Sequence, residues 1–450
     1  MALKFDLVII GSGSASVTVA FKALAAGKKV AVIDHKPIGG TCALRGCDPK
    51  KILVGVTDSL ESAKRLQGHG ISGLTGSINW NQLMDFKRSF TESMSKGIEG
   101  SLLKNGIEVL HGRARFTGPE KLEVDGKTLE SDKFLIASGV KAADLDFPGS
   151  EYLVDNEGFL SLPKLPKKIV FIGGGYISVE FASIAHKAGS DVTIIQHSDR
   201  ILVNFDKEAV ETLSGMLEES GMKIMTGCSL KGIKKSGEEY DITFLKEGRE
   251  EKVSADLVVH GAGREFDSDM GLEAGQIKWS RKGVVVNEFL QSVTNSRVYA
   301  AGDSADTAGP KLTPVATLEG NIAAENLLNG NTKKANYNGI PTTVFTSPPL
   351  AMVGITEETA SRKGIKFNVK SGEMTSWYNS RRRGLPKSFY KVIMDSDNKN
   401  ILGAHILGEN SEEVINIFAM AIRLNINAET LFSFPFTYPS DTNDMRYMVG

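Results

Sequence analysis

Short apolar runs that end in glycine clusters are the clearest pattern of this 450-residue sequence. The run 7–10 is followed by Gly-Ser-Gly-Ser and then by an alanine-rich stretch that reaches Ala26, where Gly27 ends it. An apolar run of this length is typical of a buried strand, and the stretch after the glycine turn is typical of a helix. A further apolar run at 29–33 predicts a second strand, so the segment is interpreted as a strand–helix–strand unit.

The same arrangement returns about 160 residues later. An apolar run at 168–172 leads into Gly173-Gly174-Gly175, and a helical stretch then leads to another apolar run at 191–195. Glycines between the first strand and the helix of such a unit are typical of dinucleotide binding, because phosphates approach the positive helix end there. Two units predict an α/β protein with two Rossmann-like dinucleotide sites, and a hydride donor facing a flavin is the expected arrangement.

Within the first strand–helix–strand segment, individual residues are expected to have different roles. Gly11 permits the tight turn, and Gly13 lets the backbone approach the pyrophosphate. Asp34, at the end of the second predicted strand, is the acid expected to bind ribose hydroxyls. Ser16 stands where the fingerprint has its third glycine, so the match is incomplete at that position.

Length and charge narrow the class of protein. A chain of 450 residues exceeds what one core usually holds, so two to four domains are expected. A net charge of −1 gives no excess of positive charge for nucleic acid or an anionic membrane. The one dense basic run, 381–383, is interpreted as a solvated turn or strand edge. No apolar run reaches the roughly 18 residues of a membrane span, and no signal peptide is apparent, so a cytoplasmic protein with a small-molecule substrate is expected.

Two of the three cysteines, Cys42 and Cys47, lie close together directly after a glycine turn. Three cysteines are too few for a disulfide-stapled secreted protein, and zinc would need a second ligand pair that the sequence does not supply. The spacing fits two buried thiols, but it also fits a redox-active pair, which the cysteine-poor background favours. Lys50 and Lys51 follow, and their charge favours the thiolate form.

Together these motifs resemble the pyridine nucleotide-disulfide oxidoreductases, the family of glutathione reductase, dihydrolipoamide dehydrogenase and mercuric reductase. The resemblance covers essentially the whole chain. It continues through further ordered segments at 135–139, 298–303, 312–316, 340–346, 353–357 and 401–408. It implies a homodimer in which each chain has an FAD domain in two pieces (1–150 and 266–335), an NAD(P)H domain (151–265) and a dimerisation domain (336–450).

The resemblance also implies roles for single residues. Cys47 is expected to be the sulfur next to the flavin, and Cys42 the sulfur that meets the substrate. Lys50 is expected to pair with Glu180 beside the flavin, where each would offset the desolvation of the other. Tyr176 corresponds to the tyrosine that covers the nicotinamide pocket. The residues expected to bind the two cofactors are Gly11, Gly13, Ser14, Asp34, Gly40, Thr41, Ser138, Gly139, Gly173, Gly175, Tyr176, Gln196, His197, Arg200, Gly263, Gly302 and Asp303.

The C-terminal tail departs from the family pattern. Disulfide reductases of this family end in His-Pro-Thr-x-Ser-Glu, whose histidine is the acid–base group of the partner subunit's active site. Here Tyr438 precedes the proline, and Asn443 stands where the glutamate would be. A tyrosine with an unperturbed pKa near 10 is ionised only to about one part in a thousand at pH 7, so it is a poor base for a thiol. Fast reduction of an ordinary disulfide is therefore in doubt.

Further departures from the family pattern narrow the choice of substrate and of coenzyme. Phe21 and Asn321 stand where glutathione reductases have arginines for the substrate's carboxylates, which makes glutathione disulfide a poorer candidate. The second nucleotide unit has Gln196, His197 and Arg200 where NAD-using relatives keep an acid, and this favours NADPH over NADH.

The sequence thus predicts an FAD-dependent NAD(P)H oxidoreductase that passes electrons to Cys42 and Cys47 and on to a disulfide, a thiol adduct or a similar small acceptor. A mercuric-reductase-like reduction of a soft metal ion stays open as an alternative. So do a redox-responsive flavoprotein with little turnover, and a dehydrogenase or oxidase that bypasses the cysteines.

Overall fold

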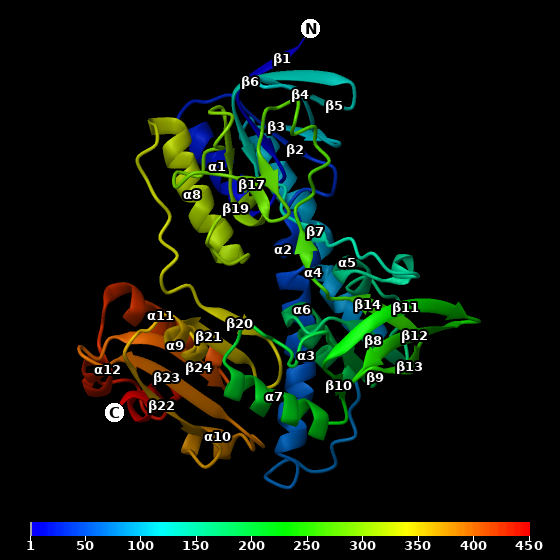
Figure 1. Ribbon diagram of the computed structural model, residues 1–450, viewed down its shortest axis with the longest axis vertical. Helices are drawn as coiled ribbons and strands as arrows, with labels where there is room; N and C mark the ends of the chain where they lie inside the picture. The colour runs from blue at the N-terminus through cyan, green and yellow to red at the C-terminus, as the bar shows by residue number, and fades with distance from the viewer. Residues whose placement is uncertain (1) are drawn as a thin grey trace. The chain divides into compact units, whose positions relative to one another are not determined.

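The computed structural model describes residues 2–450, and the chain divides into two compact units, each built from three separate segments (Figure 1). The first unit takes the chain up to Lys50 and adds Asp85–Asp144 and Arg264–Tyr337. The second takes Lys51–Met84, Leu145–Gly263 and Asn338–Gly450. Each unit is described below by itself.

A seven-stranded sheet forms the centre of the first unit, in the order β3-β2-β1-β6-β5-β4 with β18 also paired to β6. Strands β1, β2, β3, β6 and β18 are joined by parallel pairings, and β4 and β5 add antiparallel ones. The strands are β1 (Leu3–Ile10), β2 (Val30–Asp34), β3 (Glu108–His111), β4 (Arg115–Gly118), β5 (Lys121–Val124), β6 (Lys127–Ile136) and β18 (Val298–Ala300). The nearly continuous apolar sequence of β1 and β2 fits strands that are covered on both faces.

Small residues let the two main helices of this unit pack closely. Helix α1 (Ser14–Ala25) contacts α8 (Thr313–Asn329), as Figure 1 shows. A Cβ atom on Gly320 would lie 3.0 Å from the Cα of Ala15, so even a methyl group there would press against the backbone of α1. The unit also contains α2 (Gly40–Arg45), the first residues of α3 (Cys47–Arg65), most of α4 (Trp80–Lys104), β7 (Lys141–Ala142), β15 (Arg264–Glu265), β16 (Trp279–Ser280), β17 (Gly283–Val285), η2 (Gly302–Ser304) and β19 (Ala305–Asp306).

The second unit holds another parallel sheet, in the order β10-β9-β8-β14, beside a three-stranded antiparallel sheet. The parallel strands are β8 (Lys168–Ile172), β9 (Asp191–Ile195), β10 (Lys223–Met225) and β14 (Leu257–His260). The antiparallel strands are β11 (Cys228–Ser236), β12 (Glu239–Lys246) and β13 (Arg249–Ala255). The accompanying helices are η1 (Ser150–Tyr152), α5 (Asn156–Phe159), α6 (Tyr176–Lys187) and α7 (Lys207–Glu219).

A five-stranded antiparallel sheet with the order β20-β21-β24-β23-β22 forms the C-terminal part of the second unit. Its strands are β20 (Thr342–Val344), β21 (Leu350–Gly354), β22 (Phe367–Glu373), β23 (Phe389–Asp395) and β24 (Ile401–Leu407). The helices are α9 (Glu357–Arg362), α10 (Tyr378–Arg382), α11 (Ser411–Leu424), α12 (Ala428–Ser433) and α13 (Asp441–Val449). The basic run 381–383 was interpreted as a solvated turn or strand edge, and Arg381 and Arg382 are indeed exposed, but they belong to a helix and not to a strand edge. The run ends α10, and Arg383 is half-buried against Asp441.

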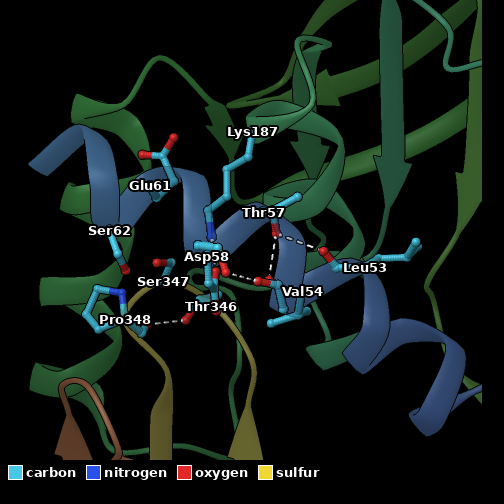
Figure 2. A network of polar contacts seen from close by, with 12 residues as sticks. Leu53, Val54, Thr57, Asp58, Glu61, Ser62, Lys187, Thr346, Ser347 and Pro348 are labelled. Atoms are coloured by element: carbon cyan, nitrogen blue, oxygen red, sulfur yellow. Dashed lines mark hydrogen bonds and ion pairs between the residues drawn. The ribbon is translucent and has the colours of Figure 1, made fainter. Parts of the chain in front are cut away.

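The later part of α3 is held by polar contacts inside the second unit. Lys187 of α6 reaches Asp58 at 2.9 Å, and the Thr57 hydroxyl donates to backbone carbonyls of its own helix (Figure 2). Arg65, at the end of α3, donates to Glu409 at 2.5 Å and to Ser347 at 3.4 Å. These contacts hold Asp58 and Arg65, in the later turns of α3, within the second unit.

The predicted fold class, α/β with two dinucleotide-binding regions and a C-terminal α+β region, is confirmed. Among residues 2–450, no helix has the length and apolar character that crossing a membrane requires.

Candidate functional site

The glycine loop after β1 is formed by backbone-to-backbone packing that excludes side chains. Gly11 has a φ of 101°, and a Cβ atom there would lie 2.3 Å from the carbonyl oxygen of Ala137. Gly40 has a φ of 75°, and its Cβ would lie 2.5 Å from the Cα of Gly13. The segment before the cysteines therefore lies directly against the glycine loop, and Gly40 leaves no room there for a side chain.

Asp34 is held in place at the end of β2 by its neighbours. The Ser12 hydroxyl donates to Asp34 Oδ2 at 2.6 Å, and the backbone N–H of Lys36 donates to Oδ1 at 2.9 Å. The N–H of Gly39 in turn donates to Ser12 Oγ at 3.0 Å. Ser12 was missed by the sequence reasoning, although its place between Gly11 and Gly13 would have signalled it. The open backbone at the start of α1 and the fixed acid fit the pyrophosphate and ribose of a dinucleotide.

A second polar cluster in the same unit surrounds the segment 302–307. Arg264 contacts Asp303 at 3.1 Å, and the N–H of Gly302 donates to Glu319 Oε2 at 2.7 Å. Glu319 is only 1% exposed, and burial raises the pKa of its carboxyl. Tyr337 donates to the same carboxylate at 2.6 Å. Arg264, Glu319 and Tyr337 were not singled out from the sequence, since no local motif marks them.

The remaining predicted positions of the first unit lie on the adjoining loops. Ser138 and Gly139 follow β6, and Gly139 has a φ of 75°. Ser14 is the first residue of α1, and Thr41 is an exposed residue of α2. The predicted cofactor residues of the first unit thus lie after β1, β6 and β18, at the end of β2 and at the start of α2.

The cysteine pair lies where two helices meet. Cys42 belongs to α2 and is half-buried, whereas Cys47 is the first residue of α3 and is exposed. The Cys47 sulfur lies 3.5 Å from the Thr313 hydroxyl at the start of α8. Lys50 is buried in the first turn of α3. Thr313 is a further candidate residue, separated from Cys47 by 266 positions in the sequence.

The surroundings place the negative charge of a reduced pair on Cys47. A hydrogen bond from the Cys42 thiol, the Thr313 hydroxyl and the charge of Lys50 lower the pKa of Cys47 to about 6, against the effect of partial desolvation. The same hydrogen bond and burial raise the pKa of Cys42. Asp48 opposes thiolate formation at both sulfurs. The reduced pair is thus a thiolate at Cys47 and a thiol at Cys42 near neutral pH.

The second glycine loop, in the second unit, repeats the backbone packing of the first. Gly173 has a φ of 95°, and a Cβ atom there would lie 2.5 Å from the carbonyl oxygen of Gly261. The N–H of Gly174 donates to Gln196 Oε1 at 2.7 Å, so Gln196 at the end of β9 is tied to the loop. Gly175 is the N-cap of α6 and leaves that helix end open to a ligand. Gly263, after β14, has a φ of 114°.

The other predicted residues of this loop region differ in their exposure and in their hydrogen-bond partners. Tyr176 is partly exposed at the start of α6, and His197 is exposed. Glu180 is buried and accepts a hydrogen bond from the N–H of Phe345 at 2.9 Å. Arg200 donates to Glu358 at 3.0 Å and to the Val203 carbonyl at 3.2 Å, so it is already engaged. The pairing of Lys50 with Glu180 stays a prediction, because the two residues belong to different units.

Of the two residues singled out in the C-terminal tail, Tyr438 is exposed and Asn443 is buried. Tyr438 is 74% exposed, the highest value among the large apolar and aromatic side chains of residues 2–450. Asn443 is buried in the first turn of α13, and its N–H donates to the Ser440 hydroxyl at 3.1 Å. Among residues 2–450, no group of three or more His, Cys, Asp or Glu side chains is placed to hold a metal ion.

Comparisons with known proteins agree with this geometry. Residues 5–320 match the model of the pyridine nucleotide-disulphide oxidoreductases, and residues 340–448 match that family's dimerisation domain. The chain is 32% identical to mercuric reductase of Staphylococcus aureus, covering 95% of this chain and 78% of that protein. It is 30% identical to dihydrolipoyl dehydrogenase of Bacillus subtilis, covering 97% and 94%. A solved Cu(II) complex of a mutant of the HOCl-induced flavoprotein disulfide reductase RclA from Escherichia coli superposes with a TM-score of 0.89 at 26% identity, covering 99% of each chain.

Proposed function

The chain belongs to the pyridine nucleotide-disulphide oxidoreductase family, and we propose that it uses NAD(P)H to reduce a small acceptor through Cys42 and Cys47. The observation that carries the proposal is the asymmetric pair itself. An exposed sulfur with a lowered pKa lies beside a thiol with a raised pKa, and the segment before them packs against a dinucleotide loop. Structural cysteines have no need of a hydroxyl and a buried lysine that favour the thiolate.

Both cofactors of the family fit residues of this chain. FAD would be held by the loop Gly11–Gly13, by Asp34 and by the segment at Gly302 and Asp303. NAD(P)H would be held at the start of α6. When bound, FAD supplies the transfer of two electrons from the nicotinamide to the cysteine disulfide. The chain's own residues would keep side chains out of the two glycine loops, hold Asp34 in place for the ribose and keep Cys47 ionised.

The cysteine chemistry can be written for a disulfide acceptor. The Cys42 sulfur, once deprotonated, attacks one acceptor sulfur, forms a mixed disulfide and releases one thiolate. The Cys47 thiolate then attacks the Cys42 sulfur, re-forms the Cys42–Cys47 disulfide and releases the second thiolate. The dithiol loses two electrons and the acceptor gains two. The Cys42 proton passes through water to the first leaving thiolate, and Tyr438 of a second copy is our candidate for the group that donates a hydrogen bond to that thiolate.

We propose NADPH as the coenzyme, with His197 in place of Arg200 as the residue that meets its 2′-phosphate. Gln196 carries no charge that would repel a 2′-phosphate. Because Arg200 is engaged by Glu358 and a backbone carbonyl, His197 is the freer group to meet the phosphate. We also propose a homodimer, because residues 340–448 match a dimerisation domain and the exposed Tyr438 lies within it.

A metal ion is the second candidate acceptor. Mercuric reductases are among the relatives, and the RclA structure is a Cu(II) complex. Thiolates bind soft metal ions. Oxidation of the Cys42–Cys47 dithiol to its disulfide would release two electrons, enough for one Hg(II) or for two Cu(II) ions. A redox-responsive flavoprotein with little turnover is a further alternative, and the tail substitutions Tyr438 and Asn443 favour it. A dehydrogenase or oxidase that bypasses the cysteines is another.

An anaerobic titration of the holoprotein with NADPH, and separately with NADH, tests the proposal. We expect a long-wavelength absorbance band of a thiolate beside the flavin, which the variant Cys47→Ser should lack. A reduced flavin without that band in the unmodified protein would show that the cysteines are not the electron exit. If the band forms, turnover with disulfides, Hg(II) and Cu(II) separates a reductase from a redox-responsive protein.

A further inference from the structure

Arg200 lies in a short loop whose two ends both touch the second glycine loop. Gln196 accepts a hydrogen bond from the N–H of Gly174 at 2.7 Å, and the N–H of Leu202 donates to the Gly174 carbonyl at 2.8 Å. A Cβ atom on Gly174 would lie 2.7 Å from Cγ2 of Ile201, so the chain passes directly over that glycine. The residues between Gln196 and Ile201 therefore lie beside the glycine loop at the end of β9, where a dinucleotide-binding unit meets the ribose and its 2′-substituent.

The guanidinium of Arg200 is bound to helix α9 of the same unit. Its Nη2 donates to Glu358 Oε2 at 3.0 Å and to the Val203 carbonyl at 3.2 Å. Its Nε is buried and has no hydrogen-bond partner among residues 2–450. Both bonds start from one nitrogen, so they do not use the two-nitrogen fork with which arginine binds a phosphate. The guanidinium therefore keeps a donor that a phosphate oxygen would fill.

Attachment of α9 does not explain this ion pair. The Glu358 side chain is 53% exposed, and an ion pair with such a partner contributes little to stability. The neighbouring Glu357 already joins α9 to the nucleotide-binding segment, because its carboxylate and that of Asp206 both contact the buried amino group of Lys391. The effect left to Glu358 is to neutralise and hold the guanidinium of Arg200.

We propose that Glu358 sets how strongly this chain discriminates between NADPH and NADH, because it holds Arg200 away from the 2′-phosphate. This rests on the proposed function, since it concerns the coenzyme of the same site. With Glu358 in place, the exposed His197 meets the phosphate without Arg200. Without Glu358, the guanidinium is released and the phosphate takes the place of the carboxylate. NADH has an uncharged hydroxyl at that position, so the release acts on NADPH.

Two nucleotides that differ only in the 2′-phosphate test this without turnover. Adenosine 2′,5′-bisphosphate and adenosine 5′-monophosphate are titrated into the holoprotein, in which FAD fills the first dinucleotide site. The dissociation constant of the monophosphate divided by that of the bisphosphate gives the contribution of the 2′-phosphate. The exposed carboxylate of Asp199 lies in the same loop and is present in every variant, so its repulsion cancels when the ratios of two variants are compared.

We expect Glu358→Gln to raise this ratio by about 10-fold, as one hydrogen bond between charged groups contributes. The double variant Arg200→Met with Glu358→Gln should return the ratio to near that of the unmodified protein, because no guanidinium is left to be released. Glu219→Gln is the matched control. Glu219 forms an ion pair with Lys387 across the same two segments of the second unit, with both partners exposed, and its loss should leave the ratio unchanged.

The outcomes separate this inference from the proposed function. An equal ratio in the unmodified protein and in Glu358→Gln overturns the role of Glu358, even where NADPH reduces the flavin faster than NADH. A rise that persists in the double variant also overturns it, because Arg200 is then not the group released. A rise that the double variant abolishes supports it, even where NADH is the better coenzyme or the cysteines receive no electrons. Binding of neither nucleotide would overturn the coenzyme site, and this role with it. With turnover, kcat/KM for NADPH relative to NADH should rise in Glu358→Gln by a similar factor, through KM rather than kcat.

Discussion

At the scale of a single residue, Thr313 shows how a side chain outside every motif sets the chemistry of one inside. Its hydroxyl lies 3.5 Å from the Cys47 sulfur and lowers the pKa of that thiol. Thr313→Val keeps the shape and removes the donor. Because a hydrogen bond to a charged group contributes roughly 1.5 kcal/mol, we expect the pKa of Cys47 to rise by roughly one unit from about 6.

The pH dependence of alkylation in the reduced protein measures this. The rate should fall as the pH drops through the pKa of Cys47, and the midpoint should move upward in Thr313→Val. Thr317→Val is the matched control, because Thr317 lies one turn later on α8 and its hydroxyl donates to the Thr313 carbonyl. An unchanged midpoint in Thr313→Val would exclude Thr313 from the thiolate's surroundings.

Sequence reasoning succeeds at residues whose role is local. Gly11 could be predicted because a turn directly after a strand needs a positive φ, and the structure gives it one. Thr313 could not, because 266 positions separate it from Cys47 and only the folded chain brings them together. Gln196 was predicted as a coenzyme residue, but its bond to the Gly174 N–H depends on side-chain geometry that no pattern contains.

At the scale of an element, the three arginines of the basic run 381–383 differ in what they contact, and one of them holds the last helix, α13. Arg383 makes two parallel bonds to Asp441 at 2.6 and 2.7 Å, and Asn410 donates to the same carboxylate at 2.7 Å. This attaches the start of α13, directly after Tyr438-Pro439. From the sequence, all three arginines of 381–383 looked alike, because which one meets the tail depends on the end of α10.

The variant Arg383→Met is expected to loosen α13 and lower the free energy of unfolding by about 1–3 kcal/mol at pH 7, since Asp441 loses its cation in a half-buried place. Arg381→Met, at an exposed position, should change it by less than about 0.5 kcal/mol. Denaturant unfolding measures both, and faster proteolysis of the C-terminus should accompany the first.

The pH dependence of that difference has a definite sign. Although burial opposes it, Arg383 and Asn410 lower the pKa of Asp441 in the folded protein. A lowered carboxyl pKa contributes stability above the unfolded-state value and loses it as the pH falls through the folded-state value. The gap between the unmodified protein and Arg383→Met should therefore shrink below about pH 4. A gap that stays constant into that range would contradict the ion pair.

At the scale of the whole molecule, the order of motifs predicted the fold class, and the family resemblance predicted an FAD domain in two pieces, 1–150 and 266–335. Neither predicted that Lys51–Met84 would belong to the second compact unit. The two glycine loops and the C-terminal strands follow one another along the chain in the expected order. Yet each compact unit takes three separate segments, and the second takes residues from both family models. Such returns of the chain are set by long-range packing, which a local pattern does not encode.

A substitution of Lys391 tests this long-range packing. Lys391 lies on β23, with its side chain and that of Asp206 each only 3% exposed, and its amino group contacts Asp206 at 3.1 Å, Glu208 at 3.2 Å and Glu357 at 2.9 Å. Although burial works against its charge, the hydrogen bond to Glu357 and the charge of Asp206 raise the pKa of Lys391. A raised lysine pKa gives stability that is fully present below the unfolded-state value near 10.4, and so at pH 7.

Lys391→Met should lower the free energy of unfolding by about 3–5 kcal/mol, because it leaves the buried Asp206 without its cation. Lys387→Met is the matched control, since Lys387 also reaches α7, through Glu219 at 2.6 Å, but both partners are exposed. Such a pair contributes less than about 1 kcal/mol. Denaturant unfolding at pH 7 should therefore separate the two variants clearly. Equal losses would mean that surface contacts, and not the buried ion cluster, join β23 to the nucleotide-binding segment of the second unit.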